Sequence, residues 1–396
     1  MEENDILTKV ESVRKVFNSG KSKSYEFRIK NIKGLKKFLK EKENEILVAL
    51  TSDLGRAKLE NQALEIMASN AELDCYLKNL KSWMQPVYVS TPAVFAPSTS
   101  YYINEPYGVA LIIGPFNYPV NLFIVPLAAA ISAGNVAIIK PSELCPACEA
   151  LFAKYLPQYI DNECYKIVCG AIKTTQILLS QKWDKIFFTG STRVGKIVMK
   201  AAAENLTSVS LELGGKSPVI IDESITDIDL VTRRILWGKS INAGQTCIAP
   251  DYVLCHSKHY DNFIEAAKKT ITKFYGEDPE KSPDFGRIVS TAHAERIGNL
   301  IKANTDKVVV GGVVDIPNRY ISPTILKDVE LDSVIMQEEI FGPVLPVIKV
   351  DDINSIIDII NRNEKPLALY IFSKNQKMID NAMNMIQSGD CMINDT

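Results

Sequence analysis

Three residue types in this chain could together carry out acyl chemistry, in which a nucleophile attacks a carbonyl carbon. Cys247 lies in the segment INAGQTCIAP, where Gly244 and Gln245 predict a tight backbone whose amides could face the thiol. Glu212 lies in LELGGKSP, and Asn117 lies in the turn GPFNYP. A nucleophile, a base and an amide donor at strand ends would serve one reaction. Most cysteines are structural, so it is the presence of Glu212 and Asn117 at corresponding strand ends that distinguishes Cys247 from the other seven cysteines.

Two further segments could bind a phosphate or a sugar. Gly190, Ser191 and Gly195 belong to a turn that follows an apolar strand and opens a helix, where free amides and a positive dipole would face an anion. The turn lacks the GxGxxG spacing of the usual dinucleotide fingerprint. A strand-to-helix turn that binds no ligand could have the same sequence. Lys140 and Glu143 of KPSE could both hydrogen-bond a ribose, although an ordinary helix start explains them equally well.

The other cysteines and the histidines do not show metal-binding spacing. Cys145 and Cys148 have no second Cys or His pair at a suitable distance, so a shared helix face explains them better than zinc or redox chemistry. His256 and His259 are expected at the surface. With three histidines in the whole chain, we expect no metal site.

The segments around these residues alternate between strands and helices. Residues 106–139 carry no charge, but Pro115, Pro119 and Pro126 argue against a single membrane helix. The same stretch predicts a strand, a helix and a strand, and further strands follow along the chain. Such alternation predicts a parallel, doubly wound α/β sheet. The predicted elements are the strands Tyr107–Ile113, Asn135–Ile139, Tyr165–Cys169, Lys185–Thr189 and Val209–Leu213, and the helix Pro119–Ile131.

A second alternating series begins after Gly215 and predicts a second domain. The run VYVSTPAVFAPSTSYYIN has β-propensity without a helical period, so we expect an extended hairpin at residues 87–104. The expected domains are therefore residues 1–86 with 105–213, the hairpin, and residues 214–396. The strands of the second series are expected at Pro218–Ile221, Asp251–His256, Val308–Gly311, Leu345–Val350 and Leu367–Phe372.

Composition narrows the class of protein. The 396 residues are 46% hydrophobic and 23% charged, which fits two packed domains and excludes disordered, collagen-like and coiled-coil chains. A net charge of −2 gives no overall field that would attract nucleic acid. The basic stretch at residues 21–42 has apolar residues at helical spacing, which favours a solvated helix face over lipid contact. Sparse cysteines and no readable targeting signal lead us to expect a cytoplasmic protein.

Six motifs in this order resemble those of the aldehyde dehydrogenase superfamily. They are GPFNYPV, KPSE, FFTGSTRVG, LELGGKSP, NAGQTCIAPDYV and QEEIFGPVLPV. The resemblance runs from about residue 10 to residue 395. Within the superfamily, the chain is similar to the class 3 branch, which includes fatty and aromatic aldehyde oxidisers. The resemblance implies two Rossmann-like domains, the first binding the cofactor and the second carrying the nucleophile. It also implies that the β-hairpin is a dimerisation arm, so a homodimer is expected.

The resemblance also implies roles for individual residues. Cys247 would be the nucleophile, Asn117 would help stabilise the oxyanion, and Glu212 would activate the water that releases the acid. The expected reaction is NAD(P)-dependent, non-acylating oxidation of medium- or long-chain aliphatic or aromatic aldehydes to carboxylic acids, through a thiohemiacetal and a thioester. The implied cofactor-binding residues are Lys140, Glu143, Gly190, Ser191, Gly195, Glu339 and Phe341.

Several alternatives stay open at this point. NAD is expected over NADP because Glu143 would repel a 2′-phosphate, although the class 3 branch often accepts NADP. A relative that transfers the acyl group to CoA would not need Glu212, and a catalytically impaired binding or structural protein could keep the same fold. Similar proteins continue past the equivalent of INDT with a Gly-rich segment and a terminal strand. We therefore expect that part of the family fold to be missing from this sequence, which leaves membrane association through such a segment open.

Overall fold

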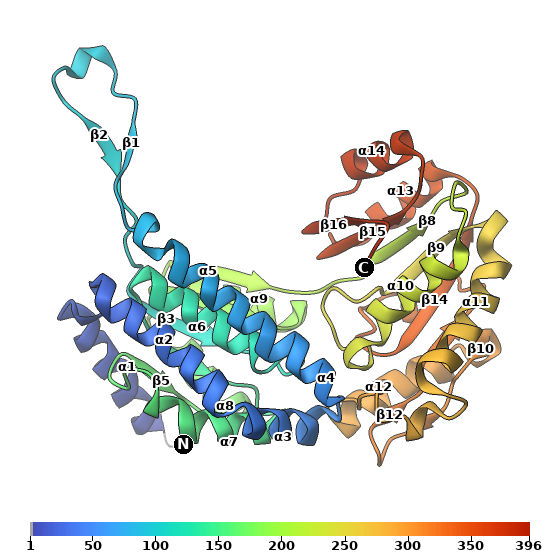
Figure 1. Cartoon of the computed structure of the whole chain (residues 1–396), viewed down its shortest axis with the longest axis horizontal. Helices are drawn as coiled ribbons and strands as arrows, with labels where there is room; N and C mark the ends of the chain where they lie inside the picture. Colours follow the sequence, from blue (N-terminus) through green and yellow to red (C-terminus); the bar gives the residue numbers. More distant parts are fainter. Residues whose placement is uncertain (1–2) are drawn as a thin grey trace. The chain divides into compact units, whose positions relative to one another are not determined.

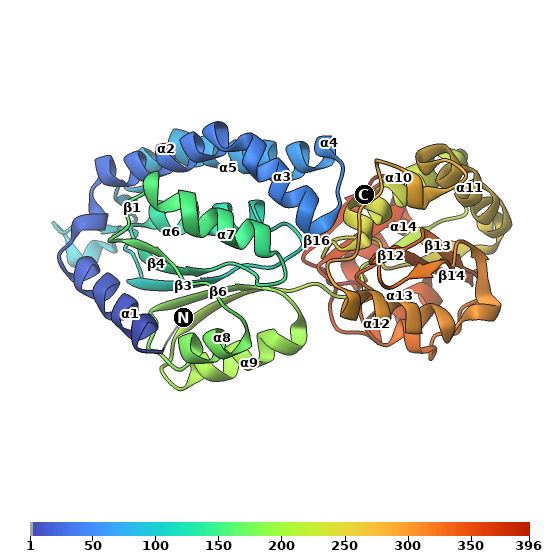
Figure 2. The ribbon, with the colours of Figure 1, turned by 90° about the horizontal axis from the view of Figure 1, so that it is seen from below.

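The computed structural model describes residues 3–396, which form two compact units. Unit 1 comprises the chain up to Asp53 together with Lys58–Glu212, and unit 2 comprises Leu54–Ala57 together with Leu213–Thr396. Figures 1 and 2 show the elements of both units from two sides. The division after Glu212 lies one residue before the boundary expected from the sequence. The sequence did not predict the excursion of the chain at Leu54–Ala57, where four residues within the first part of the chain belong to unit 2.

A five-stranded parallel sheet forms the centre of unit 1, in the order β5-β4-β3-β6-β7. Every residue of β3 and β4 is buried, as expected for strands covered on both faces. Figure 2 shows α6 and α7 on one face of the sheet and α8 and α9 on the other. The predicted parallel α/β sheet is confirmed. The strands are β3 (Val109–Ile113), β4 (Val136–Lys140), β5 (Tyr165–Ile167), β6 (Lys185–Thr189) and β7 (Ser208–Glu212), and the helices are α6 (Asn121–Ala133), α7 (Pro146–Tyr155), α8 (Ile172–Leu179) and α9 (Thr192–Ala203).

Residues 3–53 and 58–83 add a layer of helices to unit 1. Helix α2 packs against α5 and α6 through buried apolar residues that include Ile32, Leu35 and Leu39, while most of its lysines are at least partly exposed. No helix within residues 3–396 has the length and apolar character needed to cross a membrane. The helices are α1 (Glu3–Asn18), α2 (Tyr25–Glu41), α3 (Glu43–Leu54), α4 (Lys58–Asn61), the π-helical segment η2 (Gln62–Met67) and α5 (Ala68–Trp83).

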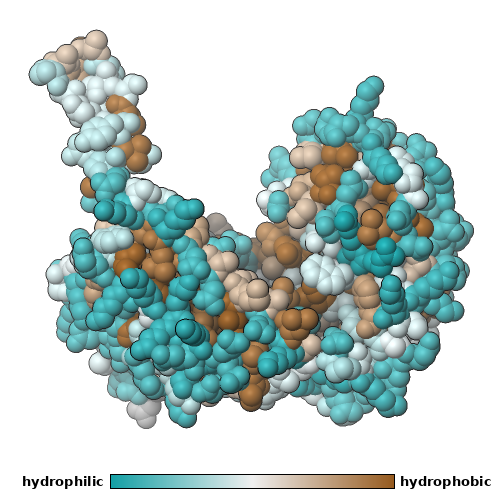
Figure 3. Space-filling model, in the orientation of Figure 1, coloured by the Kyte–Doolittle hydropathy of each residue, from teal (hydrophilic) through white to brown (hydrophobic). Residues whose placement is uncertain are grey.

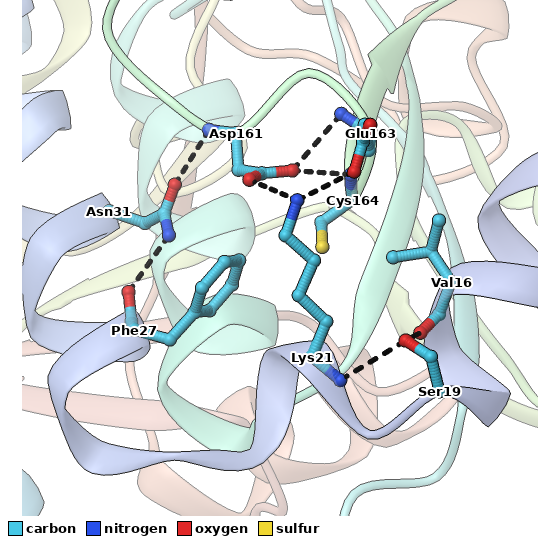
Figure 4. A network of polar contacts seen from close by, with 8 residues as sticks. All are labelled: Val16, Ser19, Lys21, Phe27, Asn31, Asp161, Glu163 and Cys164. Carbon is cyan, nitrogen blue, oxygen red and sulfur yellow. Dashed lines mark hydrogen bonds and ion pairs between the residues drawn. The ribbon is translucent and has the colours of Figure 1, made fainter.

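A polar network joins this helical layer to the loop before β5 (Figure 4). The Lys21 ammonium lies 2.6 Å from an Asp161 oxygen and 2.7 Å from a Glu163 oxygen. The Asp161 carboxylate also accepts a hydrogen bond from the Cys164 N–H, and the Asp161 N–H donates to the Asn31 side chain at 2.7 Å. Burial opposes ionisation of Asp161, but the hydrogen bonds from Lys21 and from the Cys164 N–H together outweigh it and lower the pKa of Asp161. The network fixes the entry of the chain into β5.

The expected hairpin is a short two-stranded antiparallel sheet that extends away from the body of unit 1 (Figure 1). Strand β1 (Val87–Val89) pairs with β2 (Ser100–Tyr102), and the 3-10 turn Ala93–Phe95 lies between them. Many of its apolar side chains are exposed, with Val94 at 83%, and Figure 3 shows them as brown patches on the hairpin.

A seven-stranded sheet forms the centre of unit 2, in the order β10-β13-β14-β9-β8-β15-β16. All neighbours are parallel except β10 and β13. The five strands predicted for this unit are present, whereas β13 and β16 were not predicted. The strands are β8 (Pro218–Ile221), β9 (Tyr252–His256), β10 (Val308–Val310), β13 (Thr324–Leu326), β14 (Val344–Val350), β15 (Ala368–Phe372) and β16 (Asp390–Ile393), and β11 (Val314–Asp315) pairs with β12 (Tyr320–Ile321) in a separate small sheet.

Alternate residues of the central strands enter two separate cores, one on each face of the sheet. Ile220 and Leu254 belong to one core, and Val219 and Val253 belong to the other. His259 is buried rather than at the surface as expected, because its side chain lies on the inner side of α11 and its Nε2 is 3.0 Å from the Glu223 carbonyl oxygen. The helices are α10 (Ile228–Ser240), α11 (Ser257–Tyr275), α12 (Thr291–Lys302), α13 (Ile353–Asn361) and α14 (Gln376–Met385).

Candidate active site

Two of the expected functional loops leave neighbouring strands of unit 1. Ile113 at the end of β3 pairs with Lys140 at the end of β4, and the Gly114 N–H donates to the Lys140 carbonyl at 2.9 Å. The loop after β3 carries Asn117, which is buried with 3% of its surface exposed. Because parallel strands end at the same edge of a sheet, the Asn117 loop and the KPSE loop begin side by side.

The structure brings Lys140 and Glu143 together. The Lys140 ammonium is buried and lies 2.8 Å from a Glu143 carboxylate oxygen, and it also donates to the Pro141 carbonyl at 3.1 Å. About a third of the Glu143 side chain is exposed, at 34%, so this carboxylate can still accept hydrogen bonds from a ligand. The paired lysine offsets part of its negative charge, which weakens the repulsion that Glu143 would exert on a phosphate.

The glycine turn after β6 exposes the start of α9. Ser191 caps this helix, since its side chain accepts from the Val194 N–H at 3.4 Å. A Cβ atom at Gly190 would lie 2.6 Å from the Phe188 ring, so only glycine fits beside that ring. Gly195 is buried within the first turns of the helix. The arrangement suits an anion, because amides at a helix start lack partners within the helix.

Glu212 ends β7 beside this turn. It pairs in register with Thr189, and its carbonyl accepts from the Gly190 N–H at 3.0 Å. Its side chain is exposed. Unit 1 therefore carries an exposed carboxylate next to its glycine turn, and the buried Asn117 on a separate loop.

The loop that carries Cys247 in unit 2 has a strained backbone. Asn242 and Ala243 are both buried and both have left-handed φ angles, 53° and 51°. Gly244 follows with φ 75°, and a Cβ atom there would lie 2.3 Å from the Gly342 carbonyl oxygen. Such conformations cost about 1–3 kcal/mol each for residues other than glycine and persist where the surrounding structure enforces them. The strain therefore fixes the path of the chain toward Cys247.

Gln245 holds this strained backbone in place through several hydrogen bonds, whereas the sequence indicated only a tight turn here. Its buried side-chain amide donates to the Asn242 carbonyl at 2.9 Å and to the Arg287 carbonyl at 3.0 Å, and it accepts from the Val289 N–H at 2.8 Å. Beyond it, the Ala249 N–H donates to the Thr246 carbonyl at 2.9 Å and closes a turn around Cys247. The Cys247 thiol is partly exposed on this turn.

A buried ion pair fixes the backbone around Glu339. The Lys216 ammonium lies 2.5 Å from Asp251 and also donates to the Glu338 carbonyl at 3.1 Å. Asp251 accepts in turn from the Ile340 N–H at 3.0 Å. Lys216 lies in the motif segment LELGGKSP and Asp251 lies in NAGQTCIAPDYV, and no sequence pattern connects the two residues. The chain is therefore held on both sides of Glu339.

The Glu339 carboxyl lies in a polar but crowded environment. It packs so closely against Gly214 that a Cβ atom there would lie 2.3 Å from the carboxyl oxygen. Burial raises the pKa of Glu339 to about 8, and the charge of Asp251 acts in the same direction. Burial also lowers the pKa of the nearby Lys239 ammonium to about 8. Phe341, two residues on, has a left-handed φ of 49°, so this segment is also strained.

The sequence-predicted residues thus fall into two groups. Unit 1 holds Asn117, Glu212, the Lys140–Glu143 pair and the glycine turn, and unit 2 holds Cys247, Glu339 and Phe341. Within residues 3–396, no group of three or more His, Cys, Asp or Glu side chains could hold a metal ion. The sequence did not identify Lys216 and Asp251, whose hydrogen bonds hold the backbone on either side of Glu339.

Comparison with known proteins identifies the family. Residues 1–396 match the model of the "Aldehyde dehydrogenase family". Aldehyde dehydrogenase family 3 member B1 of Rattus norvegicus is 44% identical over 387 residues, which cover 98% of this chain and 82% of the relative. The solved structure "Substrate bound state of Staphylococcus Aureus AldH" is 43% identical with a TM-score of 0.96, covering 99% of this chain and 85% of that one.

A more distant structure has the same fold. Glyceraldehyde-3-phosphate dehydrogenase GapN from Methanocaldococcus jannaschii, complexed with NADP, is 26% identical with a TM-score of 0.88, covering 100% of this chain and 86% of that one. The family match spans the whole chain, and the relative from Rattus norvegicus is a family 3 member. The chain therefore belongs to the aldehyde dehydrogenase family and is an enzyme that oxidises aldehydes.

Proposed function

We propose that this enzyme oxidises medium- or long-chain aliphatic or aromatic aldehydes to carboxylic acids with NAD, and that it does not transfer the acyl group to CoA. The observation that carries this proposal is the strained turn, braced by Gln245, that presents the partly exposed Cys247 thiol. Elaborate support for one cysteine is typical of a catalytic nucleophile. The choice of aldehyde class rests on the resemblance of the six sequence motifs to the class 3 branch.

In the first step, the Cys247 thiolate attacks the carbonyl carbon of the aldehyde. A C–S bond forms, and the carbonyl π electrons move to the oxygen. The side-chain amide of Asn117 and the backbone N–H of Cys247 donate hydrogen bonds to that oxygen. One such preorganised donor is worth about 10²- to 10³-fold in rate. The product of the step is a thiohemiacetal on Cys247.

The second half of the reaction releases the acid. A nicotinamide cofactor, when bound, supplies the acceptor for the hydride that leaves the tetrahedral carbon, and Cys247 is left as a thioester. Water is a poor nucleophile, so the Glu212 carboxylate takes its proton as it attacks the thioester carbon. The C–S bond then breaks with its electron pair on sulfur, which releases the carboxylic acid and regenerates the Cys247 thiolate.

The residues of unit 1 fit the adenosine and pyrophosphate parts of a dinucleotide. The start of α9 offers amides to the pyrophosphate, with Ser191 as its cap and Gly190 pressed against Phe188. The exposed side of Glu143 would accept hydrogen bonds from the ribose hydroxyls, with Lys140 beside it. That GapN from Methanocaldococcus jannaschii is complexed with NADP supports a nicotinamide cofactor in general.

In unit 2, Glu339 and Phe341 fit the nicotinamide end of the cofactor. The Glu339 carboxyl would accept hydrogen bonds from the second ribose, and the Phe341 ring would contact the nicotinamide. Both lie on a segment whose backbone is held by Lys216 and Asp251. We favour NAD because Glu143 repels a 2′-phosphate, while the partial neutralisation by Lys140 leaves room for some use of NADP.

The enzyme is further proposed to act as a homodimer joined through the hairpin. The hairpin exposes Tyr88, Val94 and Phe95, and within residues 3–396 its two strands pair only with each other. An exposed apolar strand edge favours association with another chain.

NADH formation against a panel of aldehydes tests the proposal. The panel contains aliphatic aldehydes of increasing length and aromatic aldehydes, each with NAD or NADP and with or without CoA. We expect activity without CoA, and no activity in Cys247→Ala. Cys75→Ala is the matched control, because Cys75 is an exposed thiol outside the loop. Strict dependence on CoA would favour the acyl-transferring alternative, and full activity in Cys247→Ala would overturn the mechanism.

A further inference from the structure

A fully buried carboxylate, Glu65, lies at the start of the helix that follows the Asn117 loop. One of its oxygens accepts hydrogen bonds from the backbone N–H groups of Val120, at 3.1 Å, and Asn121, at 2.7 Å. These amides belong to the N-cap residue and to the first residue of α6, where backbone donors lack partners within the helix. The negative charge also complements the positive end of the helix.

The sequence of α6 does not provide such a cap locally. Its N-cap residue is Val120, which has no side-chain acceptor, and its first turn contains no acidic residue. Glu65 comes instead from the π-helical segment η2, a conformation that is rare and frequently found at functional sites. Ser69 adds a second link from the same region, because it accepts from the Asn121 side chain at 3.1 Å.

The loop is also held on the other side of Asn117. The Cys145 thiol donates to the Phe116 carbonyl at 3.2 Å, and Glu65 fixes the backbone three residues after Asn117. We propose that Glu65 is a positioning residue that holds Asn117 where it can donate to the oxyanion. This inference rests on the proposed role of Asn117. Glu65 does not touch the reacting atoms, so it acts through the loop.

Asp53 offers a matched comparison, because it does the same for the neighbouring loop. Helix α7 has Cys145 as its N-cap without a side-chain bond, and Asp53 accepts from the N–H groups of Ala147, at 3.1 Å, and Cys148, at 2.9 Å. This buried carboxylate therefore fixes the end of the KPSE loop. Two similar caps thus support two different loops, one carrying Asn117 and the other Lys140 and Glu143.

Hydrogen exchange tests the structural part of the proposal without relying on activity. In the full-length protein, Glu65→Gln should increase amide exchange in residues 114–124 and leave residues 140–150 unchanged. Asp53→Asn should do the reverse. Ser24→Ala is the control for loss of a helix cap elsewhere in unit 1, since Ser24 caps α2, and it should change neither segment. Unchanged exchange at residues 114–124 in Glu65→Gln would overturn the proposal.

Rapid-mixing kinetics test the functional part. Glu65→Gln should slow the first burst of NADH about tenfold, because a displaced donor loses part of the 10²- to 10³-fold that it contributes. The KM for NAD should stay within about twofold. Glu65→Ala, which also loses the oxygen acceptor, should be slower than Glu65→Gln. Asp53→Asn should instead raise the KM for NAD and leave the burst rate at saturating NAD nearly unchanged.

The outcomes separate this inference from the proposed function. A wild-type enzyme that makes no NADH from any aldehyde, or full activity in Cys247→Ala, would overturn the proposed function, while the exchange data would still show whether Glu65 holds the loop. A normal burst in Glu65→Gln, or equal losses in the burst and in NAD affinity, would overturn positioning of Asn117. If neither Glu65 variant folds, Ser69→Ala replaces them, and a normal burst there would have the same meaning.

Discussion

Among single residues, Gly244 has little freedom to change. Its φ of 75° favours glycine, and the Gly342 carbonyl occupies the space that a side chain would need. We expect Gly244→Ala to shift the Cys247 loop, to lower kcat at least about tenfold and to reduce stability by about 1–3 kcal/mol. Gly276→Ala is the matched control, because φ there is 80° but the space beside it is open. Equal activity in the two variants would show that the turn does not position the thiol.

Glu212 should separate the two halves of the reaction. Because water activation follows thioester formation, Glu212→Gln should give a burst of about one NADH per active site and then stall. Quenched-flow measurement of NADH and of the Cys247 adduct by mass spectrometry checks this. Normal steady turnover would mean that another group activates the water, and loss of the burst would place Glu212 in activation of the thiol.

Glu339 should give stability and cofactor binding opposite dependences on pH. A carboxyl titrating at about 8 when folded and at about 4.3 when unfolded binds its proton more tightly in the folded state. Its contribution to stability is therefore complete below the unfolded pKa and is lost as the pH rises toward 8. NAD affinity should rise over the upper part of that range, since the ionised carboxyl is the better acceptor for ribose hydroxyls. Glu339→Gln should flatten both profiles, as measured by thermal melts and NAD titration.

At the scale of elements, runs of apolar residues predicted most of the strands. The residues near each loop in the sequence did not predict which side chains hold that loop in place. The strands Lys185–Thr189 and Pro218–Ile221 were predicted with their observed ends. Strand β13 is only three residues long, and β16 alternates between exposed and partly buried residues and includes a charge, so neither gives a clear apolar run.

The caps of α6 and α7 were missed for a different physical reason. Their acceptors, Glu65 and Asp53, come from distant parts of the sequence, and hydrogen bonds between distant segments leave no periodic pattern. The candidate nucleophile, by contrast, could be identified because glycine and strand-end residues surround it in the sequence. The partly buried pair of Lys140 and Glu143 was expected as two separate ribose contacts, and only the structure shows the bond between them.

The network at Lys21 gives a prediction at this scale. Asp161→Asn removes a charge that binds Lys21 and accepts from the Cys164 N–H, and we expect a loss of about 1 kcal/mol in the free energy of unfolding, since the pair is partly solvated. The loss should be present at pH 7 and should fade as the pH falls through the lowered pKa of Asp161, where the wild-type carboxyl becomes neutral too. Urea titrations at several pH values measure it, and an equal difference at every pH would contradict the charge-based account.

For the whole molecule, the hairpin predicts the state of association. Replacing the exposed Val94 and Phe95 with Asp should shift the proposed homodimer toward the monomer, because charge at an apolar interface is costly to bury. Light scattering gives the mass, and circular dichroism should show unchanged secondary structure. Val48→Asp is a control, as Val48 is also highly exposed but lies on α3. An unchanged mass in the hairpin variant would place the interface elsewhere.

The excursion at Leu54–Ala57 has a consequence for synthesis of the chain on the ribosome. These four residues belong to unit 2, and the Leu54 carbonyl accepts a hydrogen bond from the Arg287 N–H at 2.8 Å. Arg287 follows Ala57 by 287 − 57 = 230 residues. At about 5–20 residues per second, the partner emerges roughly 12–46 s later. The sheet of unit 1 can form during that interval, before Leu54–Ala57 has its hydrogen-bond partner. The nascent chain therefore carries four residues outside their final structure until nearly three quarters of the protein has been translated.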